Sequence, residues 1–196
     1  MATTATPYGF KPISHTAGTP RTVRMPLGIA SGQSGNIFKY QPVKLVAGYL
    51  SPVTLVTDKI FGIFAGVEFT PVGGQPTGSP FWPTGQTYST LENMFAYFWP
   101  AWDPALRLQV QADGAVAQAK MGAQFNVSSV SGSTVSGLSA ASVEAAGVTS
   151  TYQGQFFLSE FFDGPLSTAG DTYTDLIVGV AYPQVGPGSQ LSAYAP

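Results

Sequence analysis

The chain has 196 residues, of which only 8 are Lys or Arg and 10 are Asp or Glu, so its formal net charge is −2. Charged residues make up 9% of the sequence, against about 25% in an ordinary soluble domain. Eight scattered basic residues exclude a stripe that follows a phosphate backbone, so we expect no nucleic-acid partner. The longest apolar stretch, residues 60–67, is much shorter than the roughly 20 residues of a membrane span, so we expect no membrane partner. Low charge favours a chain that buries uncharged surface against other chains.

The first 35 residues are rich in Thr, Pro, Gly and Ser. Recurring prolines disfavour both helix and central strand, yet apolar side chains lie between them. The segment either packs irregularly on its own domain or lies along a neighbouring subunit. We adopt the second interpretation, an extended N-terminal arm over residues 1–35. Its predicted contact residues are Tyr8, Phe10, Lys11 and Ile13.

From residue 36 onward the pattern is typical of β-structure, with short apolar or alternating segments between turn signals. The expected strands are residues 36–46, 53–56, 60–67, 94–99, 106–111, 125–130, 155–162 and 175–182. Asp113 and Gly114 predict a hairpin turn that leads into a strand over residues 115–119. Residues 118–122 and 139–146 are the candidates for short helical turns. The sequence therefore predicts an all-β domain over residues 36–196, a β-barrel or β-sandwich of about 9–10 short strands.

Residues able to carry catalysis are scarce. His15 is the only histidine and cysteine is absent, which removes thiol chemistry and leaves one candidate base for a serine nucleophile. The acidic pairs Glu160 with Asp163 and Asp171 with Asp175 are candidates for a glycosidase or a calcium site. Asp163 and Asp171 fit turn positions better. We expect no enzyme activity, no catalytic residues, no cofactor and no metal site, while a weak glycan or calcium site stays open.

Three tryptophans, Trp82, Trp99 and Trp102, are the most prominent aromatic side chains. Core packing is the ordinary role of such residues, but tryptophan also anchors protein interfaces and offers a flat face to sugar rings. We predict that some of the three lie at a self-association contact.

Several strings along the chain are distinctive: ATPYGFKP at residues 5–12, NIF at 36–38, PVKLV at 42–46, GIFAG at 62–66, LQVQADG at 108–114 and GDTYTD at 170–175. Together they make the chain resemble small virion proteins of tailed bacteriophages, of the capsid cement or decoration type. The resemblance implies a β-domain that binds the outside of a capsid lattice and ties its subunits together. Such families have no catalytic residues to carry over.

The resulting hypothesis is a virion structural protein that stabilises the head lattice by linking neighbouring capsid subunits. Its expected partners are the major capsid protein, contacted through Tyr8, Phe10, Lys11 and Ile13, and further copies of itself, in a trimer rather than a dimer. The N-terminus lacks the pattern of a secretory signal, so we expect synthesis in the host bacterial cytoplasm and a place on the capsid outer surface. The first alternative is a carbohydrate-binding or host-adhesion module, and the second, less favoured one is a glycosidase-like enzyme.

Overall fold

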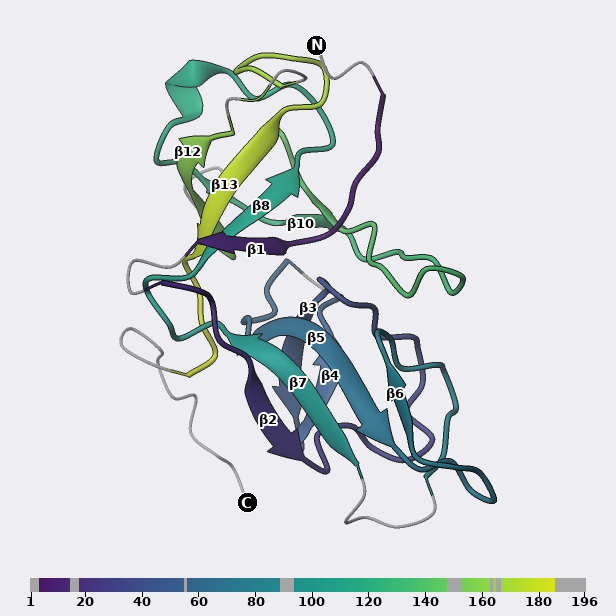
Figure 1. Ribbon diagram of the computed structural model, residues 1–196. Coiled ribbons are helices and arrows are strands. Elements are labelled where there is room, and N and C mark those ends of the chain that lie inside the picture. The colour runs from purple at the N-terminus through teal and green to yellow at the C-terminus, as the bar shows by residue number, and fades with distance from the viewer. Residues whose placement is uncertain are drawn as a thin grey trace.

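The protein is built from β-strands arranged in two lobes, one above the other in Figure 1. The computed structural model describes residues 4–14, 18–54, 56–88, 94–147, 153–162, 164 and 167–185. Within these ranges it has thirteen strands and one short 3₁₀ helix, η2 (Gln118–Lys120). The predicted all-β class is confirmed. The additional strands come from segments that the sequence analysis treats as arm, loop or helical turn.

The upper lobe is formed mainly by residues from the second half of the chain. Its antiparallel five-stranded sheet has the order β1 (Lys11–Ser14), β8 (Arg107–Gln111), β13 (Asp175–Val180), β12 (Phe156–Phe161) and β9 (Gln124–Phe125). The short pair β10 (Val127–Ser129) and β11 (Ser142–Val143) lies beside it. β8 and β13 alternate as the period of a strand requires, with Leu108, Val110, Leu176 and Val178 facing the core.

The lower lobe contains residues 18–54, 56–88 and 94–105. Its sheet has the order β2 (Val23–Pro26), β7 (Phe95–Pro100), β5 (Gly62–Phe69), β3 (Pro42–Val46) and β4 (Tyr49–Pro52), and β6 (Thr77–Ser79) also pairs with β5. The Leu50 N–H donates to the Gly28 carbonyl at 2.7 Å, which links β4 to the residues just after β2 and curls the sheet toward a barrel. β5 carries a bulge at Gly66, whose φ of 150° disfavours a side chain.

Each lobe has its own buried apolar cluster. The lower cluster lies inside the curled sheet and includes Phe64, Trp82, Met94 and Phe98. The upper cluster lies under the five-stranded sheet and extends to the boundary between the lobes, where it takes in Ile63 of β5. The lobes therefore share apolar packing at their junction.

The N-terminal segment belongs to both sheets of its own chain. β1 pairs with β8, and β2 pairs with β7. The predicted boundary at residue 35 therefore does not divide the structure, because strands before it pair with strands after it in both sheets. Of the two interpretations that the sequence allows, packing on its own domain describes residues 4–14 and 18–35. The extended arm is corrected, because strand pairing and burial fix these residues within the fold.

The strands at the sheet edges carry residues that oppose further pairing. β1 has Lys11 and Pro12 at its edge, and its register with β8 shifts between Pro12 and Ser14. β2, at the edge of the lower sheet, contains Arg24 and Pro26. Charged side chains, proline and bulges are the usual means by which proteins block edge-to-edge association. The edge strands β1 and β2 are thus protected against pairing with a strand of another chain.

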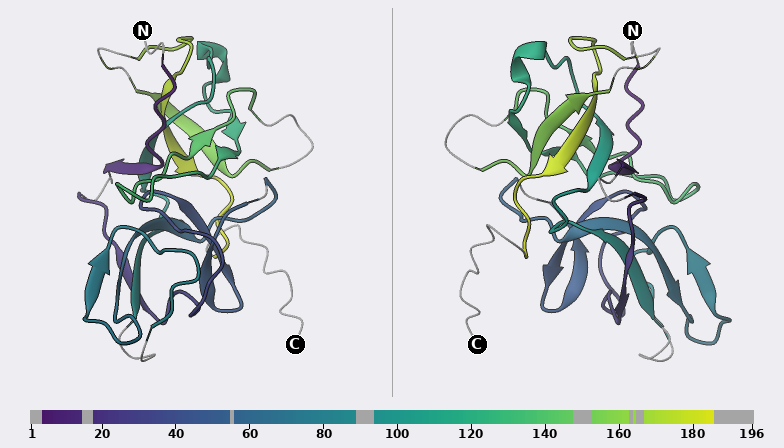
Figure 2. Two further views of the ribbon diagram at one scale, coloured as in Figure 1. Left: turned by 90° about the vertical axis from the view of Figure 1, so that its right-hand side faces the viewer. Right: turned by 60° about the vertical axis from the view of Figure 1, so that its left-hand side comes forward.

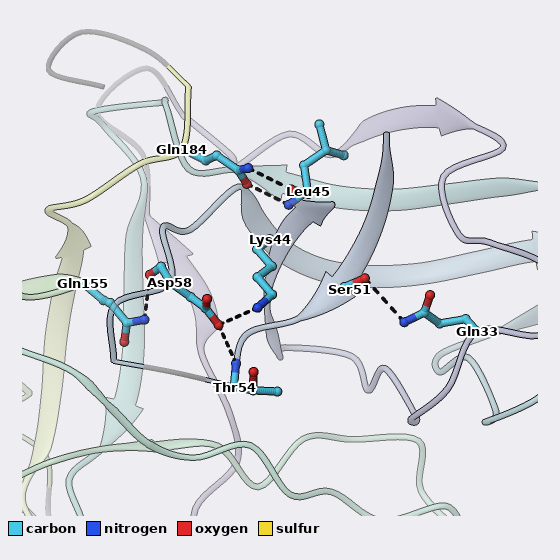
Figure 3. Close-up of polar contacts among 8 residues, drawn as sticks. All are labelled: Gln33, Lys44, Leu45, Ser51, Thr54, Asp58, Gln155 and Gln184. Atoms are coloured by element: carbon cyan, nitrogen blue, oxygen red, sulfur yellow. Dashed lines mark hydrogen bonds and ion pairs between the residues drawn. The ribbon is translucent and has the colours of Figure 1, made fainter. Parts of the chain in front are cut away.

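Polar contacts complete the junction between the lobes (Figure 3). The Gln184 side chain donates to the Leu45 carbonyl at 2.8 Å and accepts from the Leu45 N–H at 2.7 Å, as a neighbouring strand would. Asp58 binds the Lys44 ammonium at 2.8 Å, and its carbonyl accepts from the fully buried Gln155 at 2.8 Å. Gln155 directly precedes β12, so this bond joins the start of β12 to the loop after β4. These contacts join the end of the upper lobe's chain to the lower sheet.

Candidate functional site

The most exposed apolar side chain of the described residues lies at the end of a projecting loop. We call residues 131–139 the hairpin loop. It leaves the junction of the lobes after β10 and extends to the right in Figure 1, and the right-hand view in Figure 2 also shows it standing clear of both sheets. The loop is uncharged, with Ser, Gly and Thr around Val135, whose side chain is 98% exposed. Among the described residues almost nothing packs on this valine.

The hairpin loop has internal hydrogen bonds that fix its shape. Gly132 and Ser139 form an antiparallel bridge, the Ser133 N–H donates to the Leu138 carbonyl at 3.0 Å, and the Gly137 N–H donates to the Ser133 carbonyl at 2.8 Å. Backbone N–H groups near the tip, including that of Val135, bind serine hydroxyls. The backbone N–H groups of Val135 and Ser136 thus find acceptors within the loop, while the Val135 side chain stays available for contact.

The base of the hairpin loop is clamped between the two lobes. The Lys39 N–H donates to the Gly137 carbonyl at 3.0 Å, and the Ser139 N–H donates to the Lys39 carbonyl at 2.9 Å. A Cβ atom on Gly132 would come within 2.3 Å of the Phe38 ring. The close approach explains the glycine at this position and makes the loop a rigid projection.

A groove lies beside the base of the hairpin loop. We call it the junction groove, and its described lining consists of Tyr8, Lys11, Tyr40, Gln109 and Leu138. These residues come from the N-terminal segment, the turn before β3, β8 and the hairpin loop. The groove has a volume of about 390 Å³, within the range of small-ligand sites. It combines aromatic, aliphatic, amide and ammonium groups.

The two tyrosines of the junction groove are held in fixed positions. The Tyr8 hydroxyl donates to the Asp175 carboxylate at 3.1 Å. Burial, reinforced by the nearby Asp175 charge, raises the pKa of Tyr8 well above its ordinary value, so this phenol stays protonated as a donor. Burial also raises the pKa of the Asp175 carboxyl, against the opposing effect of its hydrogen bonds from Tyr8 and Gln111.

Tyr40 is fixed by its backbone as well as by its ring. Its φ is 70°, a left-handed conformation that costs energy for a residue with a side chain. Its carbonyl accepts from the Phe10 N–H at 2.8 Å, and its ring stacks on Trp99 with centroids 5.8 Å apart. The backbone of Gly9 lies directly against Tyr40. A Cβ atom at Gly9 would lie 2.8 Å from the Tyr40 carbonyl oxygen. A strained residue held by several contacts is a frequent sign of a functional site.

Comparison of the chain with family models, with curated proteins and with solved structures gave no match. The interpretation of the surface therefore depends on its geometry and chemistry. Within the described ranges, no helix has the length and hydropathy needed to cross a bilayer.

The four predicted contact residues of the N-terminal segment separate into two groups. Phe10 is fully buried and stacks on Phe156 with centroids 4.4 Å apart, so its predicted role as a contact with another protein is corrected. Tyr8 is half-buried and lines the junction groove. Lys11 and Ile13 are exposed on β1. A partner can reach these two without disturbing the fold, and their contact with a capsid stays a prediction.

The three predicted self-association tryptophans also differ in position. Trp82 is fully buried and makes edge-to-face contacts with Phe69 and Tyr88, so it is a core residue and not an interface anchor. Trp99 is half-buried at the junction of the lobes, and Trp102 is half-buried against the lower core. The self-association prediction now depends on these two.

The predicted catalytic candidates do not form a constellation in the described residues. His15 and Asp163 lie outside those residues. Asp171 accepts from the Thr168 N–H in a turn, and Asp175 is the acceptor for Tyr8. The described part of the chain contains no group of three or more His, Cys, Asp or Glu side chains placed to hold a metal ion.

A second projecting loop connects β5 to β6. It extends from the lower right of the molecule in Figure 1, and its Val72 is 66% exposed. A pocket of about 370 Å³ lies beside it, with Glu68, Thr77 and Phe95 in its wall. In the sequence, residues 70–87 are a loop rich in Pro and Gly, and residues 131–139 are rich in Ser, Gly and Thr. A single valine within a run of small uncharged residues is the signal that marks both tips.

Proposed function

We propose that this protein is a virion structural protein of the capsid cement type, which binds the outer surface of a head lattice and links neighbouring capsid subunits. The observation that carries the proposal is the hairpin loop, a rigid and uncharged projection with Val135 exposed at its tip. An exposed valine on a preformed loop has no use within the subunit and fits insertion into an apolar depression on a partner.

The energetics favour binding by such a projection. Full burial of a valine side chain contributes about 1.5–3 kcal/mol. A preformed loop loses little conformational freedom on binding, so less of that gain is cancelled. The uncharged neighbours of Val135 avoid the desolvation cost that a charged tip carries. Binding that is stronger to the assembled lattice than to free subunits stabilises the shell by mass action.

Further contacts extend the proposed interface. Lys11 and Ile13 are exposed on β1, and Val72 is exposed on the second loop. Several weak contacts on one rigid body suit a protein that spans two capsid subunits, because the second contact forms at high effective concentration.

Self-association is the second part of the proposal. Local threefold and twofold axes of a lattice match closed homo-oligomers, and we propose a trimer rather than a dimer. Trp99 and Trp102 are the remaining aromatic candidates for this contact, since both are half-exposed. Light scattering of the free protein and a reconstruction of the decorated head measure the number of copies around each axis. Isolated monomers on the lattice would contradict this part.

The test of the proposed function uses heads that lack this protein. We expect the wild type to co-sediment with them and Val135→Asp to lose most of that binding, because a carboxylate cannot be buried without a partner. Met121→Asp adds the same charge at another exposed apolar position, beside η2, and serves as the matched control. Wild-type binding should change little between about 0.05 and 0.5 M salt, since screening acts on charges and Lys11 is the one charged residue among the proposed contacts. Equal binding by Val135→Asp and the wild type would contradict the proposal.

A further inference from the structure

The junction groove has the mixed character of a site for an amphipathic small molecule. The two tyrosine rings and Leu138 provide apolar surface, while Gln109 and Lys11 provide hydrogen-bonding groups. A pocket with a mostly apolar wall and a few convergent polar groups is typical of ligand sites. The proposed cement function makes no use of this interior, because it depends on projecting side chains.

The groove is already organised without a ligand. Tyr8 is anchored by Asp175, and Tyr40 is held by its left-handed backbone and its stack on Trp99. Gln109 belongs to β8, which pairs with β1 and β13, so its backbone is held between two strands at the groove wall. Preorganised side chains lose little entropy on binding, so even a small ligand gains affinity from them.

The charged groups in and near the junction groove limit the class of ligand that it can bind. Among the described lining residues the only charged group is the Lys11 ammonium, which has no ion-pair partner in the described part of the chain. The Lys39 ammonium lies nearby, 5.3 Å from the centre of the Tyr40 ring. The Asp175 carboxylate is engaged by Tyr8. The groove therefore favours a neutral or anionic ligand over a cation.

We infer that the junction groove binds a saccharide, with preference for a sugar unit that carries a carboxylate. A sugar ring has an apolar C–H face that can lie on aromatic side chains, and hydroxyl groups that bond to amides and ammonium groups. The carboxylate of a uronic acid would pair with Lys11, and its hydroxyls would reach Gln109. This inference does not rest on the proposed cement function, whose main contact is Val135; Lys11 is the one groove residue that is also named in that interface.

The experiment measures binding of methyl β-glucuronide and methyl β-glucoside to the full chain by saturation-transfer NMR and calorimetry. We expect saturable binding of both sugars, with the glucuronide bound more tightly. Lys11→Ala should weaken glucuronide binding about tenfold, as loss of one charge-assisted hydrogen bond does, and should weaken glucoside binding clearly less, because the glucoside has no carboxylate to pair with the ammonium. Gln109→Ala should weaken both.

Gln118→Ala, at an exposed position of η2, is the matched control and should bind like the wild type. Lys11 is exposed, so Lys11→Ala keeps the test decisive even if Gln109→Ala unfolds. Absence of saturable binding by the wild type would overturn the inference, and so would wild-type affinity in Lys11→Ala and Gln109→Ala. Binding of a proline-rich peptide at these residues, with neither sugar bound, would overturn it in favour of a peptide groove. We expect Gln109→Ala to bind heads normally.

Discussion

Replacing Phe10 by alanine tests whether the N-terminal segment is part of the fold. The Phe10 ring is fully buried, and its centroid lies 4.4 Å from that of Phe156. Truncation of a buried phenylalanine costs about 3–5 kcal/mol, which includes about 0.5–1.5 kcal/mol for an aromatic pair. A domain has about 5–15 kcal/mol of stability in total. We therefore expect Phe10→Ala to remove about 4 kcal/mol, a large part of the stability of the protein.

The assay is urea unfolding followed by tryptophan fluorescence, with the free energy taken from the midpoint and slope. Ile13→Ala is the control, because Ile13 lies on the same segment but is 37% exposed. It should cost about 1 kcal/mol or less. If Phe10→Ala cost no more than this control, the segment would not be docked on its own chain in solution. The neighbouring-subunit interpretation would then return.

Three further predictions test other parts of the structure. Trp82→Ala should cost about 3–5 kcal/mol in urea unfolding. Trp82→Phe should cost clearly less, since the buried indole N–H has no hydrogen-bond partner among the described residues; equal costs would contradict the core assignment. Gly132→Ala should cost about 1–3 kcal/mol, because its Cβ would meet the Phe38 ring, while Gly78→Ala, whose Cβ has only one neighbour at 4.0 Å, should be nearly neutral by the same measurement. Burial raises the pKa of Asp175 in the folded state, so the folded protein holds that proton more tightly than the unfolded chain. The contribution of this carboxyl to stability should therefore fall as pH rises from about 4 through the raised pKa. Urea midpoints of Asp175→Asn across this pH range should lack that decline, and an unchanged slope would refute the assignment.

The sequence predicts the central strands well because their pattern is local. Residues 106–111 alternate between apolar and polar side chains, and the structure places β8 there. Residues 60–67 are apolar on both faces, as expected for β5, which is paired on both sides. In these segments the period of the side chains and the burial of the strand agree.

The failures have a common physical cause, which is competition from contacts far along the chain. Asp113 and Gly114 predict a hairpin, yet Asp113 binds the Ala145 N–H at 2.8 Å, and β8 pairs with β1 and β13. Residues 139–146 contain alanines that favour helix, but Ala141 and Val143 are buried in the upper core, and β11 forms there instead. Local propensity gives way to such burial.

The candidate site was predictable only in part. The sequence predicts Tyr8 and Lys11 as contact residues because they lie between prolines, and both line the junction groove. Tyr40, Gln109 and Leu138 come from three other segments, and no spacing in the sequence brings them together. Phe10 and Trp82 lie in segments rich in Pro and Gly, yet both are core residues. Their burial depends on segments far along the chain that pack over them, which the local sequence does not reveal.

The order of strands in the two sheets sets the order in which the protein can form during synthesis. All strands of the lower sheet lie between residues 23 and 100, so this sheet has its full set of partners when half of the chain has been made. The upper sheet takes its first strand from residue 11, but its centre is β13, which ends at residue 180 and lies between β8 and β12. Pairing over such long separations is slow, because the loop must close before any contact forms. β8 and β12 must therefore wait beside an unfilled position until β13, residues 175–180, has emerged from the ribosome.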